Sequence, residues 1–273
     1  MTDFRNPRHV VITGATGEIG GALALEYAAP GVRLTLTGRK EERLRELASQ
    51  CEGKGASVSW KTLDVCDAPA LRSWIRETDA ANPVDLLISA AGRNTQIGED
   101  FSMEPYNEVE SLVHINLMAN LALIDALVPE MRRRKSGHIA IVASLAAYYG
   151  LVYTPTYCAT KAALKSYGTS LRALLAPEGV GVSVILPGYV DSPMCRAMPG
   201  PKPFLMKADK AARIIRKGLS KNRARIGFPF PLNLGIWFLS FFPYFLAAPL
   251  AALFGYGRNG RNGGQAGTPD RKE

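Results

Sequence analysis

A tyrosine and a lysine four residues apart are the side chains in this sequence best suited to chemistry. On a helix, Tyr157 and Lys161 would leave the same face with their Cβ atoms about 5–6 Å apart. Ser144 follows an apolar run at residues 138–143 that is typical of a buried parallel strand. Ligands of open α/β sheets bind at the carboxyl ends of the strands. A hydroxyl, a phenol and an ammonium could therefore meet there and exchange a proton with a substrate oxygen.

This pair needs support from the rest of the chain, because the same spacing also occurs on solvated helix surfaces. A free phenol has a pKa of about 10, which is too high for efficient proton exchange at neutral pH. A neighbouring positive charge favours the phenolate. We therefore expect Lys161 to lower the pKa of Tyr157.

A glycine-rich turn lies between a β-branched strand at residues 9–13 and an Ala/Leu-rich helix. Its glycines, Gly14, Gly17 and Gly20, allow positive φ and let a pyrophosphate approach the backbone. The N–H groups at the start of the helix would meet the phosphate charge. Glu18 departs from the usual pattern, and its carboxylate must point away from the phosphates. The order of strand, turn and helix indicates dinucleotide binding.

The residue after the second strand indicates which dinucleotide is bound. Arg39 follows the strand at residues 32–37, nineteen positions after Gly20. A carboxylate near this position binds the ribose hydroxyl of NAD, whereas a guanidinium accommodates the 2′-phosphate of NADP. Arg39 therefore favours NADP(H). The alternative is a surface charge that opens the next helix.

Further candidate contacts follow the next strands, and each has a structural alternative. Asp64 comes after a strand at residues 56–63 and fits the adenine end of a nucleotide, although an N-cap role would also explain it. Ala91 and Gly92 follow a strand at residues 84–89, where small residues permit close approach or simply a tight turn. Asn116 lies in an apolar helix at residues 105–135, so its amide needs a hydrogen-bond partner. It could hold a buried water or stabilise a bend in the helix.

A strand at residues 180–186 ends in Pro187 and Gly188. The loop at residues 187–194 would lie over the reactive half of a bound dinucleotide and could act as a lid, with residues 199–204 as its crest. Residues 207–220 are typical of one more amphipathic helix.

Composition limits the class of protein. The 273 residues are 47% hydrophobic, enough for one α/β domain with a large core. The 33 Lys and Arg against 24 Asp and Glu suggest anionic partners, but no aromatic-basic module indicates nucleic acid. The four cysteines and three histidines have no metal-ligand spacing, so we expect no metal, and a cytoplasmic location.

Over roughly residues 8–220, these motifs resemble the short-chain dehydrogenase/reductase family in its compact single-domain form. The resemblance implies a Rossmann-like, doubly wound parallel sheet with helices on both faces. It also implies a homodimer or homotetramer. In this resemblance Tyr157 is the general acid/base, Lys161 lowers its pKa and binds the nicotinamide ribose, and Ser144 binds the substrate oxygen. Asn116 orders a water that relays protons. The implied cofactor contacts are Gly14, Thr16, Gly17, Ile19, Gly20, Arg39, Asp64, Val65, Ala91, Gly92, Tyr157, Lys161, Pro187, Gly188 and Val190.

The C-terminal part departs from this pattern. We divide the chain into a catalytic domain (residues 1–225), a hydrophobic segment (226–257) and a disordered tail (258–273). The segment is free of charged residues between Arg225 and Arg258, and prolines interrupt it, so a pair of interfacial helices is favoured over a membrane span. Basic residues flank it on both sides and suit anionic headgroups: Lys217, Lys221, Arg223 and Arg225 before it, and Arg258 and Arg261 after it. The alternative is packing on its own domain or on a second subunit.

The leading functional hypothesis is an NADP(H)-dependent oxidoreductase that interconverts a ketone and a secondary alcohol on a hydrophobic, lipid-like substrate. In that case the protein is cytoplasmic and peripheral on the inner face of a membrane, which it contacts through residues 226–257. One alternative is a soluble ketoreductase that acts on a carrier-bound acyl substrate. Another is a membrane-tethered protein that binds NADP(H) without turnover.

Overall fold

A seven-stranded parallel sheet forms the centre of the protein in this computed structural model, which describes residues 4–98 and 100–253. The strand order is β3-β2-β1-β4-β5-β6-β7, so the chain winds outward in both directions from β1 and β4. The strands are β1 (His9–Thr13), β2 (Arg33–Gly38), β3 (Ser57–Thr62), β4 (Leu86–Ser89), β5 (Gly137–Val142), β6 (Val180–Pro187) and β7 (Arg225–Phe228). This confirms the doubly wound α/β fold predicted from the sequence.

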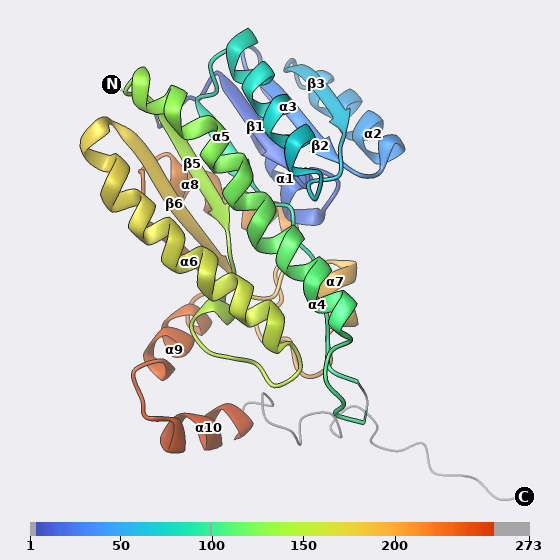
Figure 1. Cartoon of the computed structure of the whole chain (residues 1–273), viewed down its shortest axis with the longest axis vertical. Coiled ribbons are helices and arrows are strands. Elements are labelled where there is room, and N and C mark those ends of the chain that lie inside the picture. The colour runs from blue at the N-terminus through green and yellow to red at the C-terminus, as the bar shows by residue number, and fades with distance from the viewer. Residues whose placement is uncertain (1–3, 99, 254–273) are drawn as a thin grey trace, which may run out of the picture.

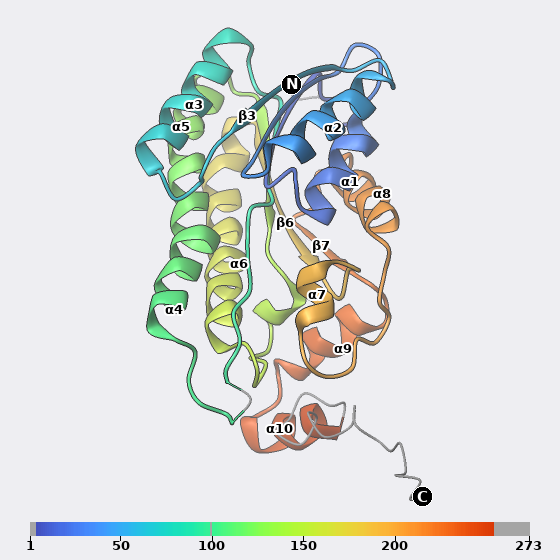
Figure 2. The same cartoon turned by 90° about the vertical axis from the view of Figure 1, so that its right-hand side faces the viewer.

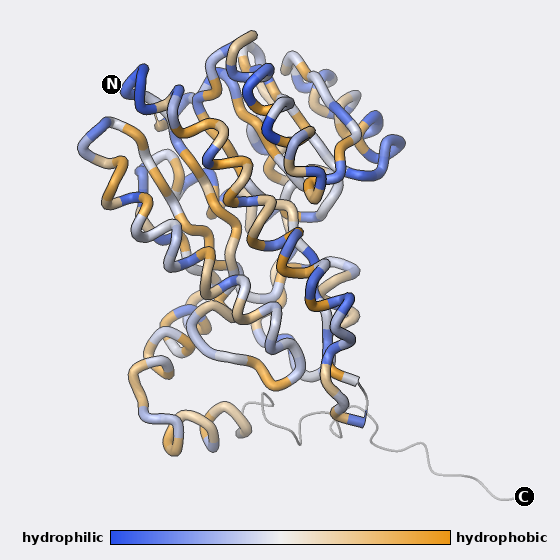
Figure 3. Tube along the Cα trace, in the orientation of Figure 1, coloured by the Kyte–Doolittle hydropathy of each residue, from blue (hydrophilic) through white to orange (hydrophobic). Residues whose placement is uncertain are grey.

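Helices cover both faces of the sheet (Figures 1 and 2). One face carries α1 (Glu18–Tyr27), α2 (Glu41–Glu52) and α8 (Ala208–Leu219), and the other carries α3 (Ala68–Ala81), α5 (Ala119–Arg133) and α6 (Pro155–Leu175). Strands β5 and β6 are buried along their whole length, which explains their continuous apolar sequence (Figure 3). The two faces of the sheet bury two separate apolar cores.

The long helix expected at residues 105–135 contains a change of helix type. It runs as α4 (Tyr106–Val113), a π-helical turn (His114–Met118) and α5. Within the described residues, Tyr106–Arg133 is the one helix long and apolar enough to cross a membrane, but half of its apolar window is buried inside the protein. It is therefore accounted for as a core helix of this fold.

The C-terminal segment begins inside the sheet. Its first residues complete β7, which pairs with β6 from Arg225 opposite Val184 to Phe228 opposite Pro187. Two helices follow, α9 (Leu232–Leu239) and α10 (Tyr244–Leu253), and they lie beyond the carboxyl ends of the strands (Figure 1). Up to Leu253 the segment is thus a strand followed by a helix pair, and its last residues, 254–257, together with the tail predicted at residues 258–273, lie outside the described residues.

This arrangement corrects the expected role of the basic flank. Lys217 and Lys221 belong to the end of α8 and its following turn, where they line a surface hollow with Arg5 and Glu26. Strand β7 then runs parallel to β6 toward the carboxyl ends of the strands, where α9 begins. These two lysines cannot therefore flank the apolar helices on one surface, and Arg258 and Arg261 lie outside the described residues.

Candidate active site

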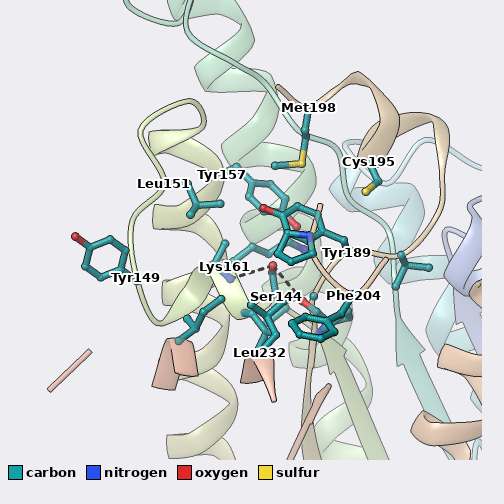
Figure 4. A pocket seen from close by; sticks show the side chains of 18 of the residues that line it. Ser144, Tyr149, Leu151, Tyr157, Lys161, Tyr189, Cys195, Met198, Phe204 and Leu232 are labelled. Atoms are coloured by element: carbon teal, nitrogen blue, oxygen red, sulfur yellow. Dashed lines mark hydrogen bonds between the residues drawn. The ribbon is translucent and has the colours of Figure 1, made fainter. Parts of the chain in front are cut away.

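A cavity of about 660 Å³ opens at the carboxyl edge of the sheet. Ser144, Tyr157 and Lys161 line it together with the loop after β6, as the close view shows (Figure 4). The parallel strands create this position because β5 and β6 end side by side, with Val142 paired to Ile185. A cavity of this size accommodates a small organic ligand.

One helix brings the tyrosine and the lysine to the same side, as their spacing predicted. Helix α6 starts at Pro155, and the Lys161 Nζ lies 5.6 Å from the centroid of the Tyr157 ring. That Nζ also donates a hydrogen bond to the backbone oxygen of Val142 at 3.0 Å. Ser144 adopts extended backbone after β5, and its Oγ accepts a hydrogen bond from the N–H of Ala146 at 3.1 Å.

Burial controls the ionisation of these groups. It raises the pKa of Tyr157 to about 12, although a hydrogen bond with Ser144 acts in the opposite direction. It also lowers the pKa of Lys161 to about 8. The expected lowering of the tyrosine pKa by Lys161 was therefore wrong for this structure, because desolvation of the phenol outweighs the effect of its neighbours. At neutral pH the phenol holds its proton and Lys161 is mainly an ammonium.

Asn116 is fully buried in the π-helical turn, at the inner side of the cavity wall. Its Oδ1 accepts a hydrogen bond from the N–H of Arg93 at 2.8 Å, and its Nδ2 donates to the backbone oxygen of Arg93 at 3.0 Å. The Asn116 backbone oxygen accepts instead from the side chain of Asn120 at 2.8 Å. The polar partner and the helix irregularity expected at Asn116 are thus both present.

Gly92 shows how closely these groups are packed. A Cβ atom there would lie 3.3 Å from the Asn116 Oδ1 and 3.4 Å from the Lys161 Nζ. Gly92 therefore sits next to both polar groups, and a larger residue would push against them. The small-residue requirement inferred from the sequence has a specific steric cause.

The glycine-rich turn has the close packing needed for a nucleotide-binding loop. Gly14 has φ +67°, and a Cβ atom there would lie 2.7 Å from the Cα of Ala91. A Cβ at Gly20 would overlap the backbone oxygen of Gly14. Gly17 is the N-cap of α1, and it has no side chain with which to cap the first N–H groups of that helix. These features fit a dinucleotide phosphate group.

Glu18 does not obstruct this loop. Its Oε1 lies 3.9 Å from Nη2 of Arg43, which also donates from Nη1 to the backbone oxygen of Thr16 at 3.4 Å. The carboxylate is thereby drawn toward α2, which resolves the difficulty raised by the sequence.

The residues expected at the adenosine end lie beside one another. Arg39 is exposed directly after β2, and Val65 is buried. Partial desolvation and the nearby Asp64 raise the pKa of the exposed Cys66 thiol, while the positive charge of Arg39 opposes this rise. The Asp64 Oδ1 accepts from the N–H of Cys66 at 3.0 Å, and Asp67 is the residue that caps α3. Asp64 therefore shapes a local turn, and its alternative role as a helix N-cap belongs to Asp67.

Only part of the predicted set lines the cavity. That part comprises Ile19, Gly92, Ser144, Tyr157, Lys161, Pro187, Gly188 and Val190. The others are not among its described lining residues: Gly14, Thr16, Gly17, Gly20, Arg39, Asp64, Val65, Ala91 and Asn116. The two groups follow one strand edge, as expected of an elongated dinucleotide site.

The loop after β6 lines the cavity and is held by two backbone hydrogen bonds. The N–H of Met206 donates to the backbone oxygen of Tyr189 at 2.9 Å, and the N–H of Asp191 donates to that of Met206 at 2.8 Å. Between these contacts, Cys195, Met198 and Phe204 line the cavity (Figure 4). The segment predicted as a lid is therefore one wall of the site.

The C-terminal helices form a further wall of the cavity, which corresponds to the alternative left open by the sequence that this segment packs on its own domain. A Cβ at Gly188 would lie 3.1 Å from Leu232 and 3.3 Å from Leu145, so the start of α9 packs beside the segment that follows Ser144. Asn233 anchors it by donating to the backbone oxygen of Gly227 at 3.0 Å. The lining residues of this wall are Pro231, Leu232, Gly235, Ile236, Phe238, Leu239, Phe242, Leu250 and Ala251.

Two aromatic pairs divide α9 and the turn after it into two sides. Phe238 and Phe242 line the cavity, and their ring centroids are 5.1 Å apart at 77°. Trp237 and Phe241 form a similar pair, 4.8 Å apart at 80°, but are not among the described lining residues. The spacing of these rings was the available signal, but the sequence alone could not say which pair faces inward.

Comparison with known proteins gives consistent results. A family model described as short chain dehydrogenase matches residues 8–200. An uncharacterized oxidoreductase of Myxococcus xanthus is 35% identical over 228 residues, covering 82% of this chain and 88% of that protein. A very-long-chain 3-oxoacyl-CoA reductase of Phaeosphaeria nodorum is 31% identical over 248 residues, covering 85% and 71%. The short-chain dehydrogenase from Sphingobium yanoikuyae, solved in complex with NADPH, has the same fold at a TM-score of 0.74 and 23% identity, covering 97% of this chain and 99% of that one.

Proposed function

The chain belongs to the short-chain dehydrogenase family, and on this basis we propose that it is an NADP(H)-dependent oxidoreductase that interconverts a ketone and a secondary alcohol on a hydrophobic, lipid-like substrate. One observation carries the proposal. Ser144, Tyr157 and Lys161 share a cavity of about 660 Å³ whose remaining walls are mostly apolar, including the two C-terminal helices. Such a site suits a polar oxygen on an apolar body.

In the proposed reduction, NADPH supplies the hydride that is added to the carbonyl carbon. Tyr157 gives its proton to the carbonyl oxygen, and its pKa of about 12 ensures that this proton is present at neutral pH. Ser144 holds the same oxygen through its hydroxyl. Lys161, Asn116 and the backbone around Gly92 hold the nicotinamide end and return a proton to Tyr157 from solvent. In oxidation, the proton and the hydride move in the opposite direction.

Arg39 supports NADP(H) over NAD(H). It is exposed after β2, and its positive charge lies close enough to the turn at Asp64 and Cys66 to affect the pKa of the Cys66 thiol. An arginine near this position accommodates a ribose 2′-phosphate. The remaining contacts are assigned to the glycine turn, with Thr16 and Ile19, and to Val65, Ala91, Pro187, Gly188 and Val190.

The names of several relatives favour an acyl-type substrate. The very-long-chain 3-oxoacyl-CoA reductase of Pyricularia oryzae is 30% identical over 211 residues, covering 72% of this chain and 62% of that protein. A long apolar ketone would fit the cavity between the loop after β6 and α9. The alternative of a soluble ketoreductase acting on a carrier-bound acyl group shares this chemistry and differs in what presents the substrate.

Contact with a membrane surface is the second part of the proposal. Beside the cavity, α9, α10 and the turn between them expose large apolar side chains, among them Phe241 at 66%, Phe245 at 71% and Tyr244 at 81%. Exposed apolar patches of this kind mark binding surfaces for proteins or membranes. We assign these outward rings to the inner face of a membrane, with the cavity opening beside it.

A flotation experiment separates membrane contact from assembly. The full chain should float with anionic liposomes, and the double variant Trp237→Ala/Phe241→Ala should float less, because both rings lie on the outward side. Added salt should weaken binding only in part, since burial of apolar rings is not screened. A chain that ignores liposomes and forms a homodimer or homotetramer instead would assign the same rings to a subunit interface.

The catalytic proposal is tested by following NADPH oxidation with apolar ketones of increasing chain length. Turnover that rises with chain length supports it. Turnover only with carrier-linked acyl substrates would favour the soluble ketoreductase. Tight NADPH binding without turnover on any ketone would favour a protein that binds the cofactor without catalysis.

A further inference from the structure

A buried carboxylate holds the start of the catalytic helix. Glu104 lies in the segment before α4 and is 7% exposed. Its Oε2 accepts a hydrogen bond from the N–H of Thr156 at 3.1 Å and a second one from the Thr156 hydroxyl. Thr156 is the residue directly before Tyr157. The contact therefore links residues 52 positions apart at the first turn of α6, where α4 and α6 start close together (Figure 2).

The helix does not supply this bond itself. Thr154 is the N-cap residue of α6, but among the described residues its side chain makes no capping bond. Its hydroxyl instead lies 3.7 Å from the Sγ of Cys158. The first N–H groups of a helix need an acceptor, and a negative charge at this end is favourable. Glu104 provides both from a distant part of the chain.

The other oxygen of Glu104 makes a purely structural explanation incomplete. Its Oε1 is buried and has no hydrogen-bond partner within the part of the chain that the structure describes. A buried charged oxygen left in this state is destabilising. An apolar residue at this position would avoid that penalty but would release Thr156. We infer that Glu104 is a positioning residue, which fixes the first turn of α6 so that the Tyr157 hydroxyl stays aligned with Ser144 and the substrate oxygen. This inference rests on the proposed role of Tyr157.

Steady-state kinetics test the inference with a graded set of variants. Glu104→Ala should lower kcat by about 10- to 100-fold, because small displacements of a catalytic group have effects of this size. The dissociation constant for NADPH should change much less than kcat, since most of the assigned cofactor contacts lie outside α6. Glu104→Gln keeps an oxygen for the Thr156 N–H and should restore most of kcat. Glu110→Ala, on the exposed side of α4, is the matched control and should behave as the parent protein.

A measurement without turnover keeps the two proposals distinguishable. In Glu104→Ala, hydrogen exchange of the amides at residues 156–158 should become faster, whereas Glu110→Ala should leave it unchanged. If no ketone is reduced by the parent protein but exchange changes as expected, the proposed reaction fails and the helix contact stands without its catalytic consequence. If Glu104→Ala keeps the parent kcat, or if Gln restores nothing, Glu104 does not position Tyr157.

Discussion

The inward aromatic pair should determine how much a long substrate chain gains from binding. Phe238 and Phe242 line the cavity and are 57% and 36% exposed, so both rings have accessible surface that a substrate chain could cover. Full burial of a phenylalanine is worth about 1.5–3 kcal/mol, and each buried methylene about 0.8 kcal/mol. In the parent protein, kcat/KM should therefore rise about fourfold per added methylene until the chain reaches these rings.

Removing the inward rings should stop that rise early. Phe238→Ala/Phe242→Ala should lose roughly 1–2 kcal/mol of transition-state binding for long ketones, which is about a 5- to 30-fold loss in kcat/KM. Short ketones should be reduced as before, because Ser144, Tyr157 and Lys161 are untouched. The assay is initial-rate NADPH oxidation over a homologous series of methyl ketones.

The outward pair provides a control with almost the same ring geometry. Trp237→Ala/Phe241→Ala removes rings 4.8 Å apart, compared with 5.1 Å for the inward pair, and should leave the chain-length dependence intact in detergent-free solution. If both double variants lose the increase in kcat/KM for long-chain ketones to the same extent, Phe238 and Phe242 are not the rings that contact the substrate. A flat chain-length profile in the parent protein would refute the underlying reasoning about the substrate.

Three further predictions concern individual groups. Tyr157→Phe should reduce turnover by at least about 10²- to 10⁴-fold, because only the transferable proton is lost, and NADPH binding measured by fluorescence should persist; substantial residual turnover would contradict the assignment. The parent protein should bind NADPH about 10- to 100-fold more tightly than NADH, since a charge-assisted hydrogen bond contributes about 1.5–3 kcal/mol. Arg39→Ala should reduce this preference in binding assays. Equal affinities of the parent protein for the two cofactors would exclude the role of Arg39. Burial lowers the pKa of Lys161 from 10.5 to about 8, so between these pH values the unfolded chain binds a proton that the folded chain has lost. The free energy of unfolding in urea should therefore rise with pH across that window by on the order of 3 kcal/mol relative to Lys161→Met, and parallel curves would argue against a buried amine.

The parts predictable from the sequence are those with a local cause. The turn at Gly14 needs positive φ, Tyr157 and Lys161 follow helix periodicity, and Asn116 is a polar residue in an apolar helix that had to find a partner. The parallel sheet follows from the alternation of buried strands and helices. These signals lie within one helix or strand or at its ends, so they can be recognised from residues close together in the sequence.

The parts that escaped prediction depend on the assembled protein. The direction of the Tyr157 pKa was wrong because spacing gives the distance to Lys161 but not the extent of desolvation. Glu104 has no pattern that links it to Thr156 across 52 residues. The side of α9 that faces the cavity depends on how Leu232 docks beside Gly188, which only the folded sheet determines.

The late position of β7 in the chain affects how the protein can be made and shortened. Strand β6 is buried over all eight of its residues, and on one side β7 covers it, with the N–H of Val184 donating to the backbone oxygen of Ala224 at 2.9 Å. While residues 224–228 are still in the ribosome, strand β6 of the nascent sheet has no partner on this side. Unpaired edge strands of this kind pair with strands of other chains. A shortened protein that ends before Arg225 should therefore aggregate during expression, whereas one that ends just after Phe228 keeps strand β7 and loses the helical wall of the cavity.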